Sequence, residues 1–169
     1  MPTLDDVYRK FGMVSEAAQL LETELGTLLL GFGIVEEGLL MPTPEANRER
    51  AADLLAGINR QTLGQLIKNA KRHTDALDQL EPLIGTAIEE RNRLAHHFYR
   101  QHNLRRNSDG GRSIMLDDLE SIHDVLLKAY KAVMLLNGID LDALVKETSA
   151  REDEGVPAGD NGPTVHLPI

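Results

Sequence analysis

The sequence predicts an all-α protein, built as an antiparallel bundle of four or five helices. Apolar residues recur at steps of three and four along most of the chain, the spacing of helices that bury one face. No stretch alternates polar and apolar residues as a half-buried strand does, and no Rossmann glycine set or P-loop is present. The 169 residues, 41% of them hydrophobic, suffice for one packed domain, which we expect over residues 1–150.

The first predicted helix begins at Leu4 and carries a single apolar stripe, as expected for a helix that packs along its length against a partner. The stripe consists of Leu4, Val7, Phe11, Val14, Ala18, Leu21, Leu25 and Leu28. Gly31 and Gly33 are expected to interrupt the helix, and Pro42 and Pro44 mark the loop that follows.

Shorter helices are predicted in the middle of the chain. One covers residues 45–57 and the next covers residues 59–72. The second of these places Leu63, Leu66, Ile67 and Ala70 on one face. Residues 73–103 form a longer segment, in which Thr74 is a candidate N-cap. Pro82 is expected to kink this segment or to restart it, because proline is tolerated in the first turn of a helix.

The last long helix is expected after a polar loop over residues 104–113, in which Asp-Gly-Gly forms the turn. Its apolar stripe consists of Leu116, Leu119, Ile122, Leu126, Ala129, Val133 and Leu136. Asn137 and Gly138 form a C-cap pair at its end. Asp140 is placed to cap one more short helix, which we expect to end near Ser149.

The tail, the cysteine content and the N-terminus indicate the cellular location. Residues 151–169 contain acids, glycines and prolines without periodicity and predict a disordered tail. The chain has no cysteine, which excludes disulfides and thiolate metal sites and is typical of a reducing compartment. Its N-terminus is acidic, no apolar signal segment follows, and no run reaches the length that a bilayer requires. We therefore expect a cytoplasmic protein with no membrane partner.

The charge is unevenly distributed. The whole chain carries −9, but residues 91–112 hold six arginines against one acid and carry +5, which leaves −14 for the rest. A basic segment on an acidic body indicates a localised anion site. Within it, Arg100, Arg105, Arg106 and Arg112 are candidate contacts to RNA phosphates at the rim of such a site, or an ordinary charged loop.

Arg91 lies where the helical pattern expects an apolar residue. The stripe of residues 77–88 continues at positions 91, 94, 95 and 98, and three of these four are apolar. A charged side chain there must be paired, or must extend its head into water. Asn92 and His96 are four residues apart on a neighbouring face, whereas Arg93 and His97 are expected on the opposite side, in solvent.

Arg91, Asn92 and His96 together suit one reaction. A guanidinium binds phosphate through two parallel hydrogen bonds, and an imidazole exchanges a proton near neutral pH. An asparagine can orient either group. These residue types fit attack of an RNA 2′-hydroxyl on its adjacent phosphate, with histidine handling the proton and arginine stabilising the developing charge. This chemistry requires no metal or other cofactor.

The segment RNRLAHHF resembles the signature of HEPN domains, in which an arginine and a polar residue precede a histidine on a helix of an all-α bundle. Arg91, Asn92 and His96 match this signature, and His97 matches it with one more intervening residue. The resemblance implies a HEPN-like fold that dimerises and joins two copies of the motif in one cleft. It also implies a metal-independent endoribonuclease, often a toxin controlled by an antitoxin or a component of antiviral defence.

One departure from the family pattern is informative. A toxin subgroup has tyrosine two positions after the histidine, and counting from His96 this position is Phe98, with Tyr99 one residue later. The nucleotidyltransferase partner of that subgroup is therefore not inferred. Some HEPN domains only bind partners, so an inactive dimerisation or interaction module is the alternative function.

Two further alternatives are a metal site and a nucleic-acid-binding regulator. His96, His97 and His102 cluster in the sequence, and Glu120 with His123 forms one Glu-x-x-His pair, whereas bundle carboxylate metal sites use two such pairs. We therefore expect no metal. A nucleic-acid-binding regulator is the other alternative, although no helix-turn-helix pattern is present and aromatic residues are too few for a stacking platform. Glu89 and Glu90 are expected to form ordinary ion pairs along the helix surface.

Overall fold

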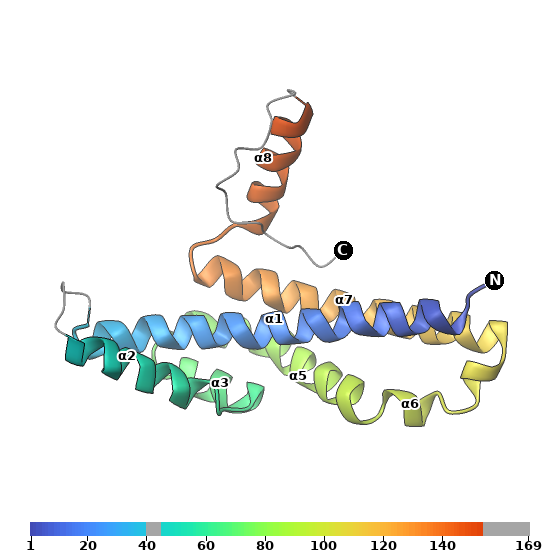
Figure 1. Ribbon diagram of the computed structural model, residues 1–169, viewed down its shortest axis with the longest axis horizontal. Helices are drawn as coiled ribbons and strands as arrows, with labels where there is room; N and C mark the ends of the chain where they lie inside the picture. Colours follow the sequence, from blue (N-terminus) through green and yellow to red (C-terminus); the bar gives the residue numbers. More distant parts are fainter. Residues whose placement is uncertain (40–44, 154–169) are drawn as a thin grey trace.

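The computed structural model describes residues 1–39 and 45–153 as a bundle of helices. Within these ranges there is no β-strand, and the prediction of an all-α bundle is confirmed. Helix α1 (Leu4–Glu36) and helix α7 (Asp109–Leu136) lie side by side along the long axis of the molecule (Figure 1). Helices α2 (Glu45–Ile58), α3 (Leu63–Ala70) and α5 (Glu81–His96) pack beneath them.

The directions of the helices follow from side-chain contacts between them. The Arg112 Nε donates to the Pro2 carbonyl, and Asn137 contacts Glu24, so α1 and α7 run parallel and not antiparallel as predicted. The ion pair from Arg91 to Glu22 and the ring contact of Phe98 with Phe11 show that α5 runs antiparallel to α1.

The core lies between α1, α5 and α7, and the apolar stripes identified in the sequence supply most of it. From α1 the buried residues are Val7, Val14, Ala17, Ala18, Leu21, Leu25, Gly26, Leu28 and Leu29. From α7 they include Met115, Leu119, Ile122, Leu126, Ala129, Tyr130, Val133 and Met134. Burial of this apolar surface is the dominant favourable contribution to folding.

The predicted end of the first helix at Gly31 was wrong, because α1 continues through both glycines to Glu36. A Cβ on Gly33 would lie 2.5 Å from the Leu54 Cδ2 atom of α2. Glycine at this position therefore permits close helix packing rather than breaking the helix.

The helices in the middle of the chain occur in the expected order, but one predicted N-cap is shifted by one residue. The Thr62 hydroxyl and the Gln65 side chain form a capping box at the start of α3. Pro82 is the second residue of α5, so the helix restarts there as predicted, after the short helix α4 (Ala76–Gln79). The residue before α4 is Asp75, which takes the position expected for Thr74.

The expected loop over residues 104–113 is shorter than predicted. A single 3₁₀ turn, η1 (Arg105–Asn107), leads directly into α7, and the Asp-Gly-Gly sequence is its first turn. The Ser108 side chain caps this helix by accepting a hydrogen bond from the Gly111 N–H at 3.1 Å. A Cβ on Gly111 would overlap the carbonyl oxygen of Arg105, so glycine is required by close backbone approach.

At the other end of α7, the predicted cap is confirmed: Asn137 is the C-cap and Gly138 adopts φ +81°. Asp140 accepts a hydrogen bond from the Ala143 N–H at 3.1 Å and caps α8 (Leu141–Asp153), which projects away from the bundle (Figure 1). This helix includes residues 151–153, which the sequence assigned to the tail. The rest of the predicted tail, residues 154–169, lies outside the described residues.

Helix α1 is long and apolar enough to cross a membrane by length and composition, with a mean hydropathy of 1.3 over 18 residues. This corrects the expectation that no run reaches such a length. The core helix of a soluble protein passes the same test, and nine residues of α1 are buried against the rest of the bundle.

Candidate functional site

The RNRLAHHF segment forms the last two turns of α5 and the junction with α6 (Phe98–Gln101). Leu94 and Phe98 are buried and anchor the segment to the core. His97 interrupts the helix, with φ −128° and ψ −17°, and serves as the C-cap of α5. The side chains of His96 and His97 are both exposed at this corner, and their ring centroids lie 6.3 Å apart.

Arg91 is half-buried at the edge of the core, as its place in the apolar stripe predicts. Its Nη2 atom lies 2.7 Å from the Glu22 Oε1 atom of α1, and its Nη1 donates to the Asn92 Oδ1 at 3.1 Å. The Glu22 Oε1 atom is buried and, among the described residues, accepts no hydrogen bond of good geometry. Its charge is therefore stabilised by the Arg91 guanidinium. Glu22 could not be predicted as a partner of Arg91, because this ion pair joins two helices that are distant in the chain.

Asn92 and His96 are exposed one turn apart on α5. Asn92 accepts a hydrogen bond from Arg91, whereas no hydrogen bond or ion pair joins His96 to either residue. We refer to Glu22, Arg91, Asn92 and His96 as the Arg91 group. It presents one guanidinium, one amide and one imidazole at an open surface, with a carboxylate behind the guanidinium.

Arg93 does not lie in solvent, contrary to expectation. Its Nη1 and Nη2 atoms each donate to one carboxylate oxygen of Asp118 on α7, both at 2.8 Å, and its Nε donates to Glu90 at 2.8 Å. The Glu90 contact confirms the expected pairing along the helix. Hydrogen bonds from Arg93, and then the one from His102, hold the pKa of Asp118 below its ordinary value.

His102 is buried beside Asp118 and is separated from the two exposed histidines. Its Nε2 atom lies 2.7 Å from the Asp118 Oδ2, and its Nδ1 lies 3.1 Å from the Arg105 Nη1. A guanidinium only donates hydrogen bonds, so Nδ1 accepts and Nε2–H donates to Asp118. We refer to Glu90, Arg93, His102, Arg105 and Asp118 as the Arg93 network.

The four arginines predicted to contact RNA have different surroundings. The Arg112 guanidinium donates to the carbonyls of Pro2 at 2.7 Å and Arg106 at 3.0 Å and pairs with Asp109, so it holds the N-terminus against α7. This engagement disagrees with a role for Arg112 as a free phosphate contact. Arg105 is exposed in part but contacts His102.

Arg100 and Arg106 differ from those two. Both side chains are exposed, and no protein group of the described residues forms a hydrogen bond or ion pair with either guanidinium. Of the four candidates, these two are therefore the ones whose side chains are available to a ligand.

The Glu120–His123 pair of the alternative metal site is occupied by a protein cation. Lys10 of α1 forms an ion pair with Glu120, and its Nζ lies 3.4 Å from the His123 Nδ1. Burial, and then the charge of Lys10, lower the pKa of His123. Across residues 1–39 and 45–153, no three histidine or acidic side chains come together in a metal-binding arrangement.

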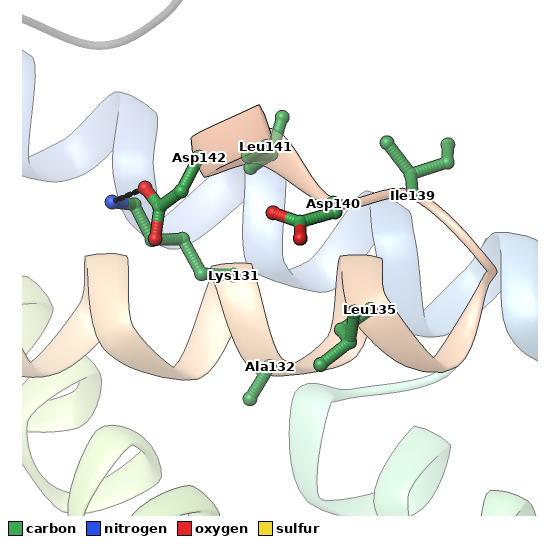
Figure 2. Close-up of a pocket in the computed structure, with 7 residues that line it drawn as sticks. All are labelled: Lys131, Ala132, Leu135, Ile139, Asp140, Leu141 and Asp142. Carbon is green, nitrogen blue, oxygen red and sulfur yellow. Dashed lines mark hydrogen bonds and ion pairs between the residues drawn. The ribbon is translucent and has the colours of Figure 1, made fainter. Parts of the chain in front are cut away.

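Two cavities lie away from the Arg91 group. One, of about 270 Å³, is formed at the elbow between α7 and α8; the ion pair of Lys131 with Asp142, at 2.6 Å, lies at one end of it, and Ile139 lies at the other (Figure 2). The other, of about 260 Å³, lies between α1, α2 and α3, next to the contact of His73 with Glu36. Neither cavity is lined by a residue that the sequence predicted for the functional site.

Comparison of the chain with known family models, with curated proteins and with solved structures finds no match.

Proposed function

We propose that this protein is a metal-independent endoribonuclease of HEPN type, with Arg91, Asn92 and His96 at its active site. The supporting observation is the different setting of these neighbours in one short helix: Arg91 is half-buried and oriented by Glu22, while His96 is free at the surface one turn further on. A positioned cation and an accessible imidazole on the same helix are the groups that phosphoryl transfer without a protein nucleophile requires.

The proposed reaction is a transesterification within the RNA strand. The 2′-oxygen of one nucleotide attacks the adjacent phosphorus, and the bond from phosphorus to the 5′-oxygen of the next nucleotide breaks. A histidine takes the 2′-hydroxyl proton, and a second acid protonates the departing 5′-oxygen. The products are a 2′,3′-cyclic phosphate and a 5′-hydroxyl. Arg91 stabilises the additional negative charge on the phosphate oxygens, and His97 is the second choice for the base.

We also propose that the active form is a homodimer. In one copy, Asn92 and His96 lie on an open helix surface, where a phosphate is held from one side only. A second copy that brings its own motif would exclude water and supply the second proton-transfer group. A cytoplasmic location and control by an antitoxin or defence partner belong to the same proposal, since free ribonuclease activity is harmful to a cell.

The test is RNA cleavage in EDTA by wild type, His96→Ala, His97→Ala and Asn103→Ala, the last an exposed control just beyond α6. We expect the His96 variant to lose about 10²- to 10⁴-fold in rate, the usual contribution of a general acid or base. The control should retain full activity. Products with 2′,3′-cyclic phosphate ends support the proposal, and equal cleavage by all four proteins contradicts it.

The alternative is an inactive interaction module, and two observations favour it. Glu22 already neutralises Arg91, so one carboxylate competes with any phosphate. The elbow of α7 and α8 also exposes Leu135 at 61% and Ile139 at 38%, as a partner-binding surface would. A well-folded dimer that cleaves no RNA and binds another protein through this elbow would support the alternative.

A further inference from the structure

Two tyrosines that are distant in the sequence meet at the molecular surface. Tyr8 of α1 is 47% exposed and Tyr99 of α6 is 38% exposed, and their ring centroids lie 6.5 Å apart. The third tyrosine of the chain, Tyr130, is buried in α7. The fold therefore assembles an exposed aromatic pair that the low aromatic content of 4% did not suggest.

Two phenylalanines support the Tyr99 ring of this pair. The Tyr99 ring packs against Phe11 at 5.1 Å and against Phe98 at 5.3 Å between centroids. Phe98 is 1% exposed and belongs to the core. A ring supported in this way presents its surface with little loss of conformational entropy when a ligand stacks on it.

Two arginines adjoin the pair in the sequence, and a third acts on it from η1. Arg9 and Arg100 follow the two tyrosines directly in the sequence, and their side chains are exposed. The exposed Arg106 of η1 also acts on this place, because its charge opposes the rise in the Tyr99 pKa that burial and Tyr8 cause. Aromatic rings beside unpaired arginines are typical of surfaces that bind single-stranded nucleic acid.

We propose that Tyr8 and Tyr99 form a stacking platform for an unpaired base of single-stranded RNA, with Arg100 and Arg106 binding the adjoining phosphates. This inference rests on the proposed function, because it concerns the same substrate. Tyr99 follows His96 by three residues, across the break at His97. The stacked base therefore belongs to a nucleotide close to the phosphate that is cleaved, and the platform favours unpaired over double-stranded RNA.

Charge argues for RNA over a second copy of the chain at this surface. A two-fold contact would bring the patch against itself and place Arg9, Arg100 and Arg106 opposite the same three arginines. Like charges placed opposite each other disfavour such an interface, whereas an RNA backbone is complementary to them.

The experiment measures binding separately from cleavage. The probe is a mixed-sequence single-stranded oligonucleotide with 2′-O-methyl riboses, which lacks the attacking hydroxyl, labelled for fluorescence anisotropy. Tyr8→Ala and Tyr99→Ala should each weaken binding about tenfold, because base stacking on an aromatic ring typically contributes that much. Tyr8→Phe and Tyr99→Phe retain the rings and should bind as wild type does. Tyr130→Phe and Leu104→Ala, an exposed apolar control in the same region, should also be unaffected.

A second readout uses the absence of tryptophan from the chain. Intrinsic fluorescence then reports tyrosine alone, and stacking of a base should quench the signal of wild type but not that of the Tyr8→Ala, Tyr99→Ala double variant. The platform is overturned if the double variant binds the probe like wild type, or if wild type binds no probe. It is also overturned if the substitutions change the oligomeric state of the protein and leave probe binding unchanged.

The experiments distinguish failure of the proposed platform from failure of the proposed nuclease activity. Probe binding that depends on the tyrosines, in a protein that cleaves no RNA, supports the platform and contradicts the proposed activity. Cleavage that depends on His96, with probe binding unchanged by loss of the tyrosine rings, supports the activity and overturns the platform.

Discussion

Two arginines of α5, separated in the sequence only by Asn92, have opposite surroundings. Arg93 donates to both oxygens of Asp118 and to Glu90, and it is the centre of the Arg93 network. Arg91 meets one carboxylate, Glu22, and its other contact is to the neighbouring Asn92. The two side chains have similar exposed fractions, 29% for Arg91 and 25% for Arg93, so exposure does not separate them.

The difference shows that partners, rather than burial, decide which arginine is available to a ligand. Arg93 joins α5 to α7 and, through Asp118 and His102, to the turn that follows α6. Its bidentate geometry makes displacement by a phosphate costly. Arg91 has fewer hydrogen bonds to lose, and it lies next to the exposed side chains of Asn92 and His96.

The largest expected effect on stability comes from breaking the Arg93 network. Asp118→Ala removes both bonds from Arg93 and the acceptor of the His102 Nε2–H. Hydrogen bonds to charged groups contribute about 1.5–3 kcal/mol, so we expect the free energy of unfolding to fall by about 2–3 kcal/mol. Urea denaturation measures the change. Asp117→Ala, on the exposed neighbour, is the control, and a loss below 1 kcal/mol for Asp118→Ala would contradict the role of the network.

A smaller effect on stability is expected when pH changes the protonation of a second buried histidine, His123. Burial and Lys10 lower the pKa of His123 in the folded state, so the unfolded chain binds a proton more readily. Stability is then complete above the ordinary histidine pKa of about 6.5 and falls as pH decreases below that value. Urea midpoints between pH 7.5 and 5 should fall more for wild type than for His123→Gln. Parallel curves for the two proteins would show that His123 titrates normally.

Much of the fold could be predicted from the sequence, because helical periodicity and caps are local signals. Pro82 at the start of α5 and Gly138 after α7 are examples. Gly33 and Gly111 were misinterpreted because their role depends on the neighbouring Leu54 side chain and Arg105 backbone, which local sequence does not specify.

In the candidate site, too, local features could be predicted from the sequence and contacts between distant segments could not. The unusual position of Arg91 and the pairing of Glu90 with Arg93 follow from helical spacing alone. Glu22, Asp118 and the Tyr8–Tyr99 pair could not be predicted, since each contact joins segments that are distant in the chain. The buried position of His102 was missed for the same reason.

The smallest effect on stability is expected from Glu22→Gln, which changes the partner of Arg91 and leaves the arginine itself in place. The substitution keeps the shape of the side chain and removes the charge opposite Arg91. We expect a change in unfolding free energy below about 1 kcal/mol, as for other partly exposed ion pairs. Because Arg91 is then uncompensated, affinity for the 2′-O-methyl probe should rise a few-fold. Unchanged or weaker binding would indicate that Arg91 does not contact the phosphate.

The different roles of the two arginines are tested by comparing Arg91→Ala and Arg93→Ala for both RNA cleavage and the free energy of unfolding. Arg91→Lys is included because it retains a positive charge opposite Glu22 but loses the planar fork. We predict that both Arg91 variants lose at least about 100-fold in cleavage rate, typical for a lost transition-state donor, while staying folded. Arg93→Ala should instead lose about 2–3 kcal/mol of stability, the cost of its charged hydrogen bonds. Folded Arg91 variants that cleave RNA as fast as wild type would contradict the proposed role of Arg91 in the active site.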